Sequence, residues 1–108
     1  MINLSKKKDV FIIVTGVSIK AYRNKSGDII KAKVQIMPHK DGITETVIVS
    51  GLRVKIVPLN KNKKKNRDRI GTVTGFTEQY RDLRAKVQFD DTKGIGKIEL
   101  EELVIINE

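Results

Sequence analysis

Short runs rich in Val and Ile, separated by turn residues, constrain the fold of this chain more than any other feature. The runs are VFIIV (10–14), AKVQIM (32–37), TVIV (46–49), RVKIV (53–57), RIGTV (69–73), AKVQF (85–89), KIEL (97–100) and LVII (103–106). Each has the length and composition of a strand, and no apolar stripe with helical spacing persists for three turns. The sequence allows a single helical turn around TEQYRDL (77–83). We therefore predict an all-β chain.

Alternation within the runs assigns faces to the predicted strands. In 33–36 and 86–89, the order Lys-Val-Gln-apolar places Val and the larger apolar residue on one face and the polar pair on the other. Residues that favour tight reversals lie between the runs in NKSGD (24–28), HKDG (39–42) and DDTKG (90–94). A strand-and-turn rhythm of about ten residues is typical of small antiparallel barrels.

Three short motifs occur twice in the same order along the chain. Val-Thr-Gly, Tyr-Arg and Ala-Lys-Val-Gln stand at 14–16, 22–23 and 32–35, and again at 73–75, 80–81 and 85–88. This predicts a tandem duplication in which Val-Thr-Gly ends a strand at a turn, Tyr-Arg lies in the loop beyond it, and Ala-Lys-Val-Gln starts the returning strand. We expect two domains, 1–53 and 54–108, with GLRVKIVPLN (51–60) at their junction. They form either two small barrels in tandem or one pseudo-twofold β-barrel system.

The second half of the chain also carries an ordered set of motifs. They are a Gly-x-x-Val-x-Ile strand (Gly51–Ile56), a basic loop (Lys61–Arg69), a Gly-x-Val strand (Gly71–Val73), a Val-x-Phe strand (Val87–Phe89) and a final strand with a closing Leu (Ile98–Leu103). This order resembles a KOW module, the small SH3-like barrel of NusG-type transcription elongation factors and several ribosomal proteins. The first half carries an echo of it, with Ile12 in the place of Gly71. The resemblance implies binding to RNA, DNA or a ribonucleoprotein machine, although such barrels also bind proteins.

The charge of the chain favours a polyanionic partner. It has 22 Lys and Arg against 13 Asp and Glu, which gives a net charge of +9. The alternative is a lysine-rich surface that only keeps a small protein soluble. The densest basic segment, KNKKKNRDR, holds Lys61, Lys63, Lys64, Lys65, Arg67 and Arg69, with an echo at Lys6, Lys7 and Lys8. These side chains are predicted to contact phosphates; alternatively, the segment is a solvated linker whose lysines repel one another.

The paired Tyr-Arg motifs complete the predicted binding set. Tyr22 and Tyr80 can stack on unpaired bases, while Arg23 and Arg81 reach phosphates. The alternative is that each Tyr packs over its own barrel with a hydrated hydroxyl. Arg84 is the last member of the set. From Ile98 to Glu108 there are four Glu and no Lys or Arg, which indicates pairing with basic residues of the same barrel or a face turned away from phosphate.

The sequence lacks the residues or spacings that several classes of function require. The chain lacks Cys, which excludes disulfides, thiolate zinc sites and a Cys nucleophile, and its one His, His39, lies in a predicted turn. The segment TKGIGKI (92–98) fails as a phosphate loop because Asp91 stands where Gly is required, and Asp90-Asp91 is weak support for a metal. We expect no enzyme activity and no cofactor. The apolar run at 10–14 is too short to span a bilayer, so we expect a cytoplasmic protein without a membrane partner.

We therefore predict a non-enzymatic nucleic-acid-binding protein. It would bind RNA or single-stranded DNA largely through phosphates, with weak sequence specificity, as an accessory factor of transcription or translation. The alternative is a protein-interaction module that pairs through a strand edge or docks on an acidic partner. Abundant Lys and Ile fit an AT-rich genome, so such a module could be a phage or mobile-element accessory protein acting on a host machine. A third hypothesis is a structural role in a virion or on a ribosome.

Overall fold

The computed structural model describes residues 8–12, 16–36, 44–79 and 82–107 of the chain. These residues form nine strands and one short 3₁₀ helix, without an α-helix, so the all-β prediction is confirmed for the described ranges. The chain divides into two compact units, Met1–Val49 and Ser50–Glu108, whereas the predicted boundary follows residue 53. The two units are described separately.

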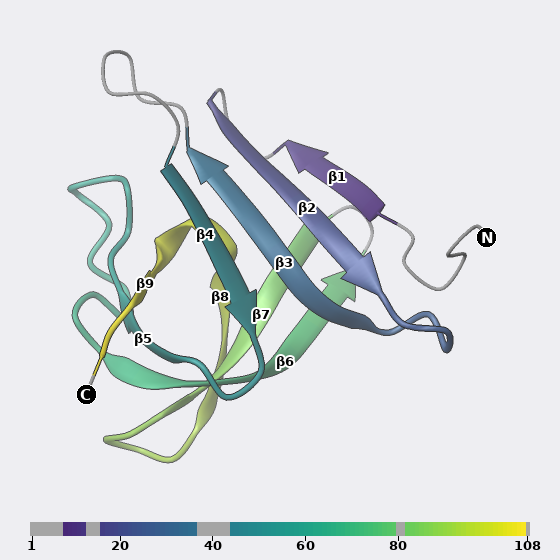
Figure 1. The fold of residues 1–108 in the computed structure, drawn as a ribbon. Helices are drawn as coiled ribbons and strands as arrows, with labels where there is room; N and C mark the ends of the chain where they lie inside the picture. Colours follow the sequence, from purple (N-terminus) through teal and green to yellow (C-terminus); the bar gives the residue numbers. More distant parts are fainter. Residues whose placement is uncertain (1–7, 13–15, 37–43, 80–81, 108) are drawn as a thin grey trace. The chain divides into compact units, whose positions relative to one another are not determined.

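The first unit is a four-stranded antiparallel meander (Figure 1). Its strands, in both chain order and spatial order, are β1 (Lys8–Ile12), β2 (Val17–Arg23), β3 (Ile29–Ile36) and β4 (Thr44–Val49). Ile19 lies opposite Val34 and Ala21 opposite Ala32, and all four side chains are buried on one face. This confirms the alternation that the sequence predicts for β3, because the side chains between them point to the other face.

Strand β2 is the element that the sequence analysis does not predict. Its apolar positions, Val17, Ile19 and Ala21, alternate with polar ones, and the alternation is a signal for a half-buried strand. The Tyr-Arg motif of this unit ends β2, so its predicted place in a loop is wrong. The turn predicted at 24–28 is present: the Asn24 side-chain Oδ1 accepts hydrogen bonds from the backbone N–H groups of Ser26 and Asp28 at 2.9 and 3.0 Å.

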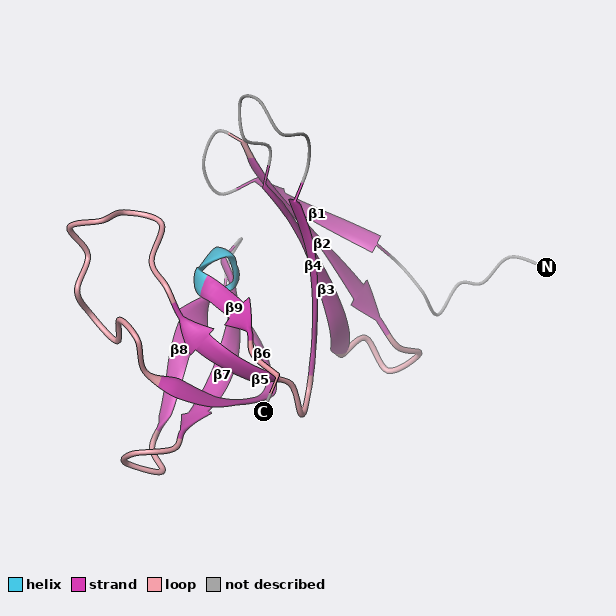
Figure 2. Ribbon diagram, turned by 60° about the vertical axis from the view of Figure 1, so that its left-hand side comes forward, coloured by secondary structure: helices cyan, strands magenta, loops and turns pink. Residues whose placement is uncertain are grey.

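The second unit is a five-stranded antiparallel sheet with one 3₁₀ helix (Figure 2). Its elements are β5 (Arg53–Ile56), β6 (Ile70–Gln79), β7 (Asp82–Phe89), β8 (Ile95–Glu99), the 3₁₀ helix η2 (Leu100–Glu102) and β9 (Leu103–Ile105). The spatial order is β8-β7-β6-β5-β9, so the last strand returns to pair with the first, with Ile56 opposite Leu103. The buried apolar side chains are Val54, Ile56, Val73, Leu83, Ala85, Val87, Phe89, Ile98, Leu100 and Leu103.

The repeated motifs occupy partly equivalent places in the two units. Ala-Lys-Val-Gln lies in β3 and in β7, the returning strand of a hairpin in each unit, and its Ala and Val are buried in both. Val-Thr-Gly differs: Gly16 lies in a turn before β2 with a φ of 88°, whereas Val73–Gly75 lies inside β6, where the register shifts. The predicted turn is therefore wrong for the second copy. The helical turn that the sequence allows at 77–83 is not formed in the described part of this range, which belongs to β6 and β7.

Neither sheet closes on itself within the described residues. Strands β1 and β4 end the first sheet, and β8 and β9 end the second, each with one strand neighbour. What the structure shows is two antiparallel sheets in an all-β chain.

Gly71 has a steric role in the second sheet. A Cβ at this position would collide with the backbone carbonyl oxygen of Gln88 and would lie 2.7 Å from Cγ1 of Val87. Close approach of the two strand backbones therefore requires glycine here.

Candidate nucleic-acid interface

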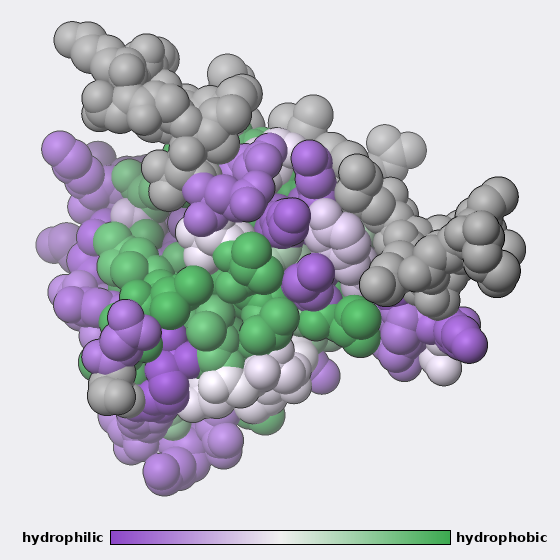
Figure 3. Space-filling model, viewed as in Figure 1, coloured by the Kyte–Doolittle hydropathy of each residue, from purple (hydrophilic) through white to green (hydrophobic). Residues whose placement is uncertain are grey.

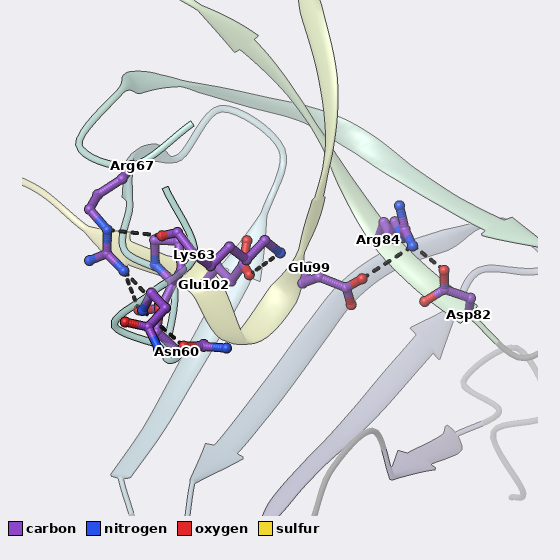
Figure 4. Close-up of polar contacts among 9 residues, drawn as sticks. Asn60, Lys63, Arg67, Asp82, Arg84, Glu99 and Glu102 are labelled. Atoms are coloured by element: carbon purple, nitrogen blue, oxygen red, sulfur yellow. Dashed lines mark hydrogen bonds and ion pairs between the residues drawn. The ribbon is translucent and has the colours of Figure 1, made fainter. Parts of the chain in front are cut away.

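The basic segment Lys61–Arg69 lies in the loop between β5 and β6, and Arg67 holds this loop in shape. The Arg67 guanidinium donates to the backbone carbonyl oxygens of Asn60 at 2.8 Å, Lys63 at 3.0 Å and Pro58 at 3.4 Å (Figure 4). The backbone N–H of Lys63 donates to Asn60, and that of Arg67 donates to Lys64. Arg67 is thus directed at the backbone of its own loop, which it organises into successive turns.

Two further loop cations are paired with acidic side chains. Nζ of Lys63 lies 2.6 Å from Oε2 of Glu102, which is only 7% exposed. Arg69 donates to Asp91 at 2.8 Å and to Asn66 at 2.7 Å. Its guanidinium carbon also lies 3.7 Å from the ring centroid of Phe89. These contacts tie the loop to the 3₁₀ helix and to the turn after β7, and the pairing predicted for the acidic C-terminal segment is confirmed for Glu102.

The remaining loop cations are exposed. The side chains of Lys61, Lys64 and Lys65 make no hydrogen bond or ion pair with any residue that the structure describes. The loop therefore contains two kinds of basic residue. Some stabilise its conformation, and others extend from it toward solvent with their charge uncompensated.

A hollow of about 220 Å³ lies beside the loop, and we call it the basic hollow. Its lining residues are Lys63, Lys65, Asn66, Arg84, Lys97, Ile98, Glu99 and Glu102. The structure thus brings Arg84, from β7, to the same place as two of the predicted loop lysines. A second hollow of about 200 Å³ shares Arg84 and Lys97 and adds Thr77, Gln79 and Asp82.

Lys97 is a basic-hollow residue that the sequence analysis missed. It is exposed and lies opposite Lys86 in the register of β7 and β8, on the face away from buried Ile98. Alternation in the KIEL run is the signal that could have assigned it to the outer face. This alternation could not have shown that Lys97 lies beside the basic loop.

Acidic side chains offset part of the charge in the basic hollow. Nε of Arg84 lies 2.7 Å from Asp82, and its Nη2 lies 3.2 Å from Glu99. Burial raises the pKa of Glu99 above its usual value, and the nearby Arg84 charge opposes that rise. Burial also raises the pKa of Glu101, whose buried Oε1 finds no hydrogen-bond partner among the described residues. Within the described ranges, the side chains of Lys65 and Lys97 in the basic hollow, and of Lys61 and Lys64 on the loop, have no acidic partner.

The aspartates that follow β7 serve as anchors for arginines. A hydrogen bond from Arg53 holds the pKa of Asp90 below its usual value, and one from Arg69 does the same for Asp91. No group of three or more potential metal-ligating side chains is found within the described ranges. The two aspartates link β5 and the basic loop to the turn at 90–94.

The predicted residues of the first unit that the structure describes are Lys8, Tyr22 and Arg23, which lie at one end of the β1–β2 pair. Tyr22 is half-buried, with Nζ of Lys31 4.7 Å from its ring centroid and Nζ of Lys33 at 5.9 Å. Arg23 follows Tyr22 at the end of β2, where the register shifts, and its Nη1 donates to the backbone carbonyl of Gly27 at 2.9 Å. Lys8 of β1 lies opposite Tyr22 in register. The predicted Lys6, Lys7, Tyr80 and Arg81, and the turn predicted around His39, lie outside the described residues.

Within the described ranges, no helix has the length and apolar character needed to cross a membrane. Comparison of the chain with protein families, with curated proteins and with solved structures gives no significant match.

Proposed function

We propose that this chain is a non-enzymatic nucleic-acid-binding protein that contacts the phosphates of RNA or single-stranded DNA through the basic loop and the basic hollow. One observation carries the proposal. Arg67 and the Lys63–Glu102 ion pair fix the conformation of the loop, while Lys61, Lys64 and Lys65 are left exposed without an acidic partner among the described residues. Such a loop presents several cations to a polyanion, and part of the entropic cost of ordering it is already met.

The arrangement favours phosphate contact over base readout. Uncompensated lysines at the loop and in the basic hollow are point charges, which attract a backbone but do not distinguish sequences. No α-helix is present in the described residues to enter a major groove. Single-stranded or structured RNA and single-stranded DNA are therefore better partners than duplex DNA, and sequence specificity should be weak.

We further propose that the second unit is a KOW-like, SH3-like module, which would suit an accessory factor of transcription or translation. The first four motifs of the resemblance lie on β5, the basic loop, β6 and β7, with the basic loop joining the first two strands. The last motif departs from the pattern of one final strand, because Ile98–Leu103 spans the end of β8, η2 and the start of β9. The steric requirement for Gly71 gives the glycine of the Gly-x-Val strand a physical reason. Ile12, which stands in its place in the first unit, belongs to β1.

A protein-interaction module is the second candidate, because each edge strand of the second sheet carries an exposed apolar side chain. Ile95 on edge strand β8 is 62% exposed, and Val104 on edge strand β9 is 45% exposed. An exposed edge with apolar side chains can accept a strand from a partner. Binding of that kind should depend little on salt.

The test is fluorescence anisotropy with labelled single-stranded RNA, single-stranded DNA and duplex DNA over a range of salt concentrations. A variant with Lys64→Gln and Lys65→Gln should bind more weakly, and the slope of log K against log salt should decrease by about 1.4, or 0.7 per lost contact with a single strand. The matched control replaces one exposed turn lysine from each unit, Lys25→Gln with Lys93→Asn, and should leave the slope nearly unchanged.

Two results would overturn the proposal. Absence of binding to all three probes at low salt would remove the nucleic-acid function. An equal loss in the loop variant and the control would show that only net charge matters and that the loop is not a site.

A further inference from the structure

The outer face of the first sheet carries a second group of uncompensated cations, separate from the basic loop. We call it the lysine face. It consists of Lys20 and Tyr22 on β2, Lys31 and Lys33 on β3, and Val47 and Val49 on β4. Register places Tyr22 opposite Lys31 and Lys20 opposite Lys33, and these four side chains point away from the face that buries Ile19 and Val34.

The positive charge of the lysine face is concentrated, and the acid that register places on the same face, Glu45, accepts a hydrogen bond from Gln35 at 2.9 Å. Lys20 and Lys33 lie directly opposite each other, an arrangement that destabilises a sheet when the charges are alike. None of Lys20, Lys31 and Lys33 pairs with an acid among the described residues. In the second unit, by contrast, Arg53, Lys63 and Arg69 each contact a carboxylate. A bound polyanion would supply the charge that the first sheet lacks.

Tyr22 positions two of these lysines. The ammonium groups of Lys31 and Lys33 both converge on its ring, at 4.7 and 5.9 Å from the centroid. A cation–π contact of this kind favours one position of a flexible lysine head group over others. Because the Lys31 ammonium group lies over the Tyr22 ring, the ring does not offer an open surface on which a base could stack. Tyr22 would therefore contribute to binding by positioning the lysines.

An apolar strip borders the cations. Val47 lies opposite Lys33 and Val49 opposite Lys31, and each valine is 37% exposed. In Figure 3, apolar surface gathers over the position of β4, with polar surface beside it toward β3 and β2. A duplex encloses its bases, whereas a single strand offers phosphates and apolar base faces together. Cations beside an exposed apolar strip therefore fit a single strand.

We propose that the lysine face is a second binding site, specific for single-stranded nucleic acid, with phosphates on Lys20, Lys31 and Lys33 and bases against Val47 and Val49. The site goes beyond the basic loop of the proposed function, because it belongs to the other unit and discriminates single strands from duplexes. Tyr22 is its positioning residue.

The experiment measures binding of the full chain to labelled oligo(dT), to oligo(U) and to a duplex across a salt series. A Lys31→Gln, Lys33→Gln variant should lower the single-strand salt slope by about 1.4. The Lys25→Gln, Lys93→Asn control should not lower it. Circular dichroism confirms that each variant keeps its strand content.

Two further variants test the parts of the site that carry no charge. Val47→Thr with Val49→Thr keeps both side chains β-branched, and should weaken single-strand binding by up to about tenfold, from the lost burial of a methyl group at each position, without changing the salt slope or duplex binding. Tyr22→Leu should reduce the salt slope, and Tyr22→Phe, which keeps the ring, should restore it.

The outcomes separate this proposal from the function of the basic loop. If the Lys31, Lys33 variant binds like the wild type while the Lys64, Lys65 variant loses affinity, the lysine face is not a site and the loop function stands. If the valine variant weakens duplex and single strand alike, the proposed preference for single strands is wrong. If the wild type binds no probe at low salt, both proposals fail together.

Discussion

Replacing Arg67 with Lys tests whether Arg67 stabilises the basic loop or binds phosphate directly. The substitution preserves charge but removes the planar fork that reaches three backbone carbonyls of the basic loop. A lysine ammonium can retain one of these contacts. A hydrogen bond from a charged donor contributes about 1.5–3 kcal/mol when well formed, and the contact to Pro58 is long at 3.4 Å. We therefore expect the loop to be destabilised by about 2 kcal/mol.

Amide hydrogen exchange measures this change locally. The backbone N–H groups of Lys63 and Asp68 donate to Asn60 and Ile56, so both should be protected in the wild type. A loss of about 2 kcal/mol corresponds to exchange roughly 30-fold faster at these amides. The amide of Asp90, which donates to Ile70 outside the loop, is the internal reference and should change little.

Nucleic-acid binding by the same variant completes the test. Because Arg67→Lys keeps the charge, the salt slope of binding should stay close to that of the wild type, whereas Arg67→Gln should lose loop protection to the same extent. Unchanged exchange at Lys63 and Asp68 in Arg67→Lys would refute the structural role assigned to Arg67. A reduced salt slope with a fully protected loop would instead make Arg67 a direct phosphate contact.

Three further predictions concern the second unit. Gly71→Ala should lower the free energy of unfolding, measured in urea, by about 3 kcal/mol, because the added Cβ would clash with backbone atoms that cannot move aside. Gly75→Ala should lower it by less than about 1 kcal/mol, because its Cβ would meet only the flexible Lys86 side chain. Similar values for the two variants would contradict the steric argument. The ion pair that lowers the pKa of Asp90 stabilises the fold above the usual carboxyl pKa and is lost as pH falls through the lowered value, so Asp90→Asn should flatten the acid decline of the urea midpoint. Burial raises the pKa of Glu101, so the folded state binds a proton at a higher pH than the unfolded state does, and acidification through that pKa adds stability. Glu101→Gln should abolish this gain in the urea midpoint. A midpoint that still rises by the same amount on acidification of the variant would show that another group causes the gain.

The sequence predicts most of the strands because their signal is local. Apolar runs and the turn residues at 24–28 and 90–94 mark eight of the nine strands in the described residues. Strand β2 is missed because its core side includes small Ala21 and its outer side is polar, which leaves a short alternating pattern and no apolar run. The repeat is also a local signal, yet the motif's Gly16 lies in a turn in one unit, whereas Gly75 lies at a strand irregularity in the other. A shared motif therefore does not ensure a shared backbone conformation.

Net charge and the position of the basic segment follow from the sequence by itself. Which cations remain uncompensated was decided only by the tertiary structure. Lys63 and Glu102 lie 39 positions apart in the chain, yet their side chains meet at 2.6 Å because η2 comes next to the basic loop. Lys20 and Lys33 face each other only because β2 and β3 pair in a particular register. A period of two residues tells which face a side chain occupies, but the partner across that face depends on strand register and on contacts distant in sequence.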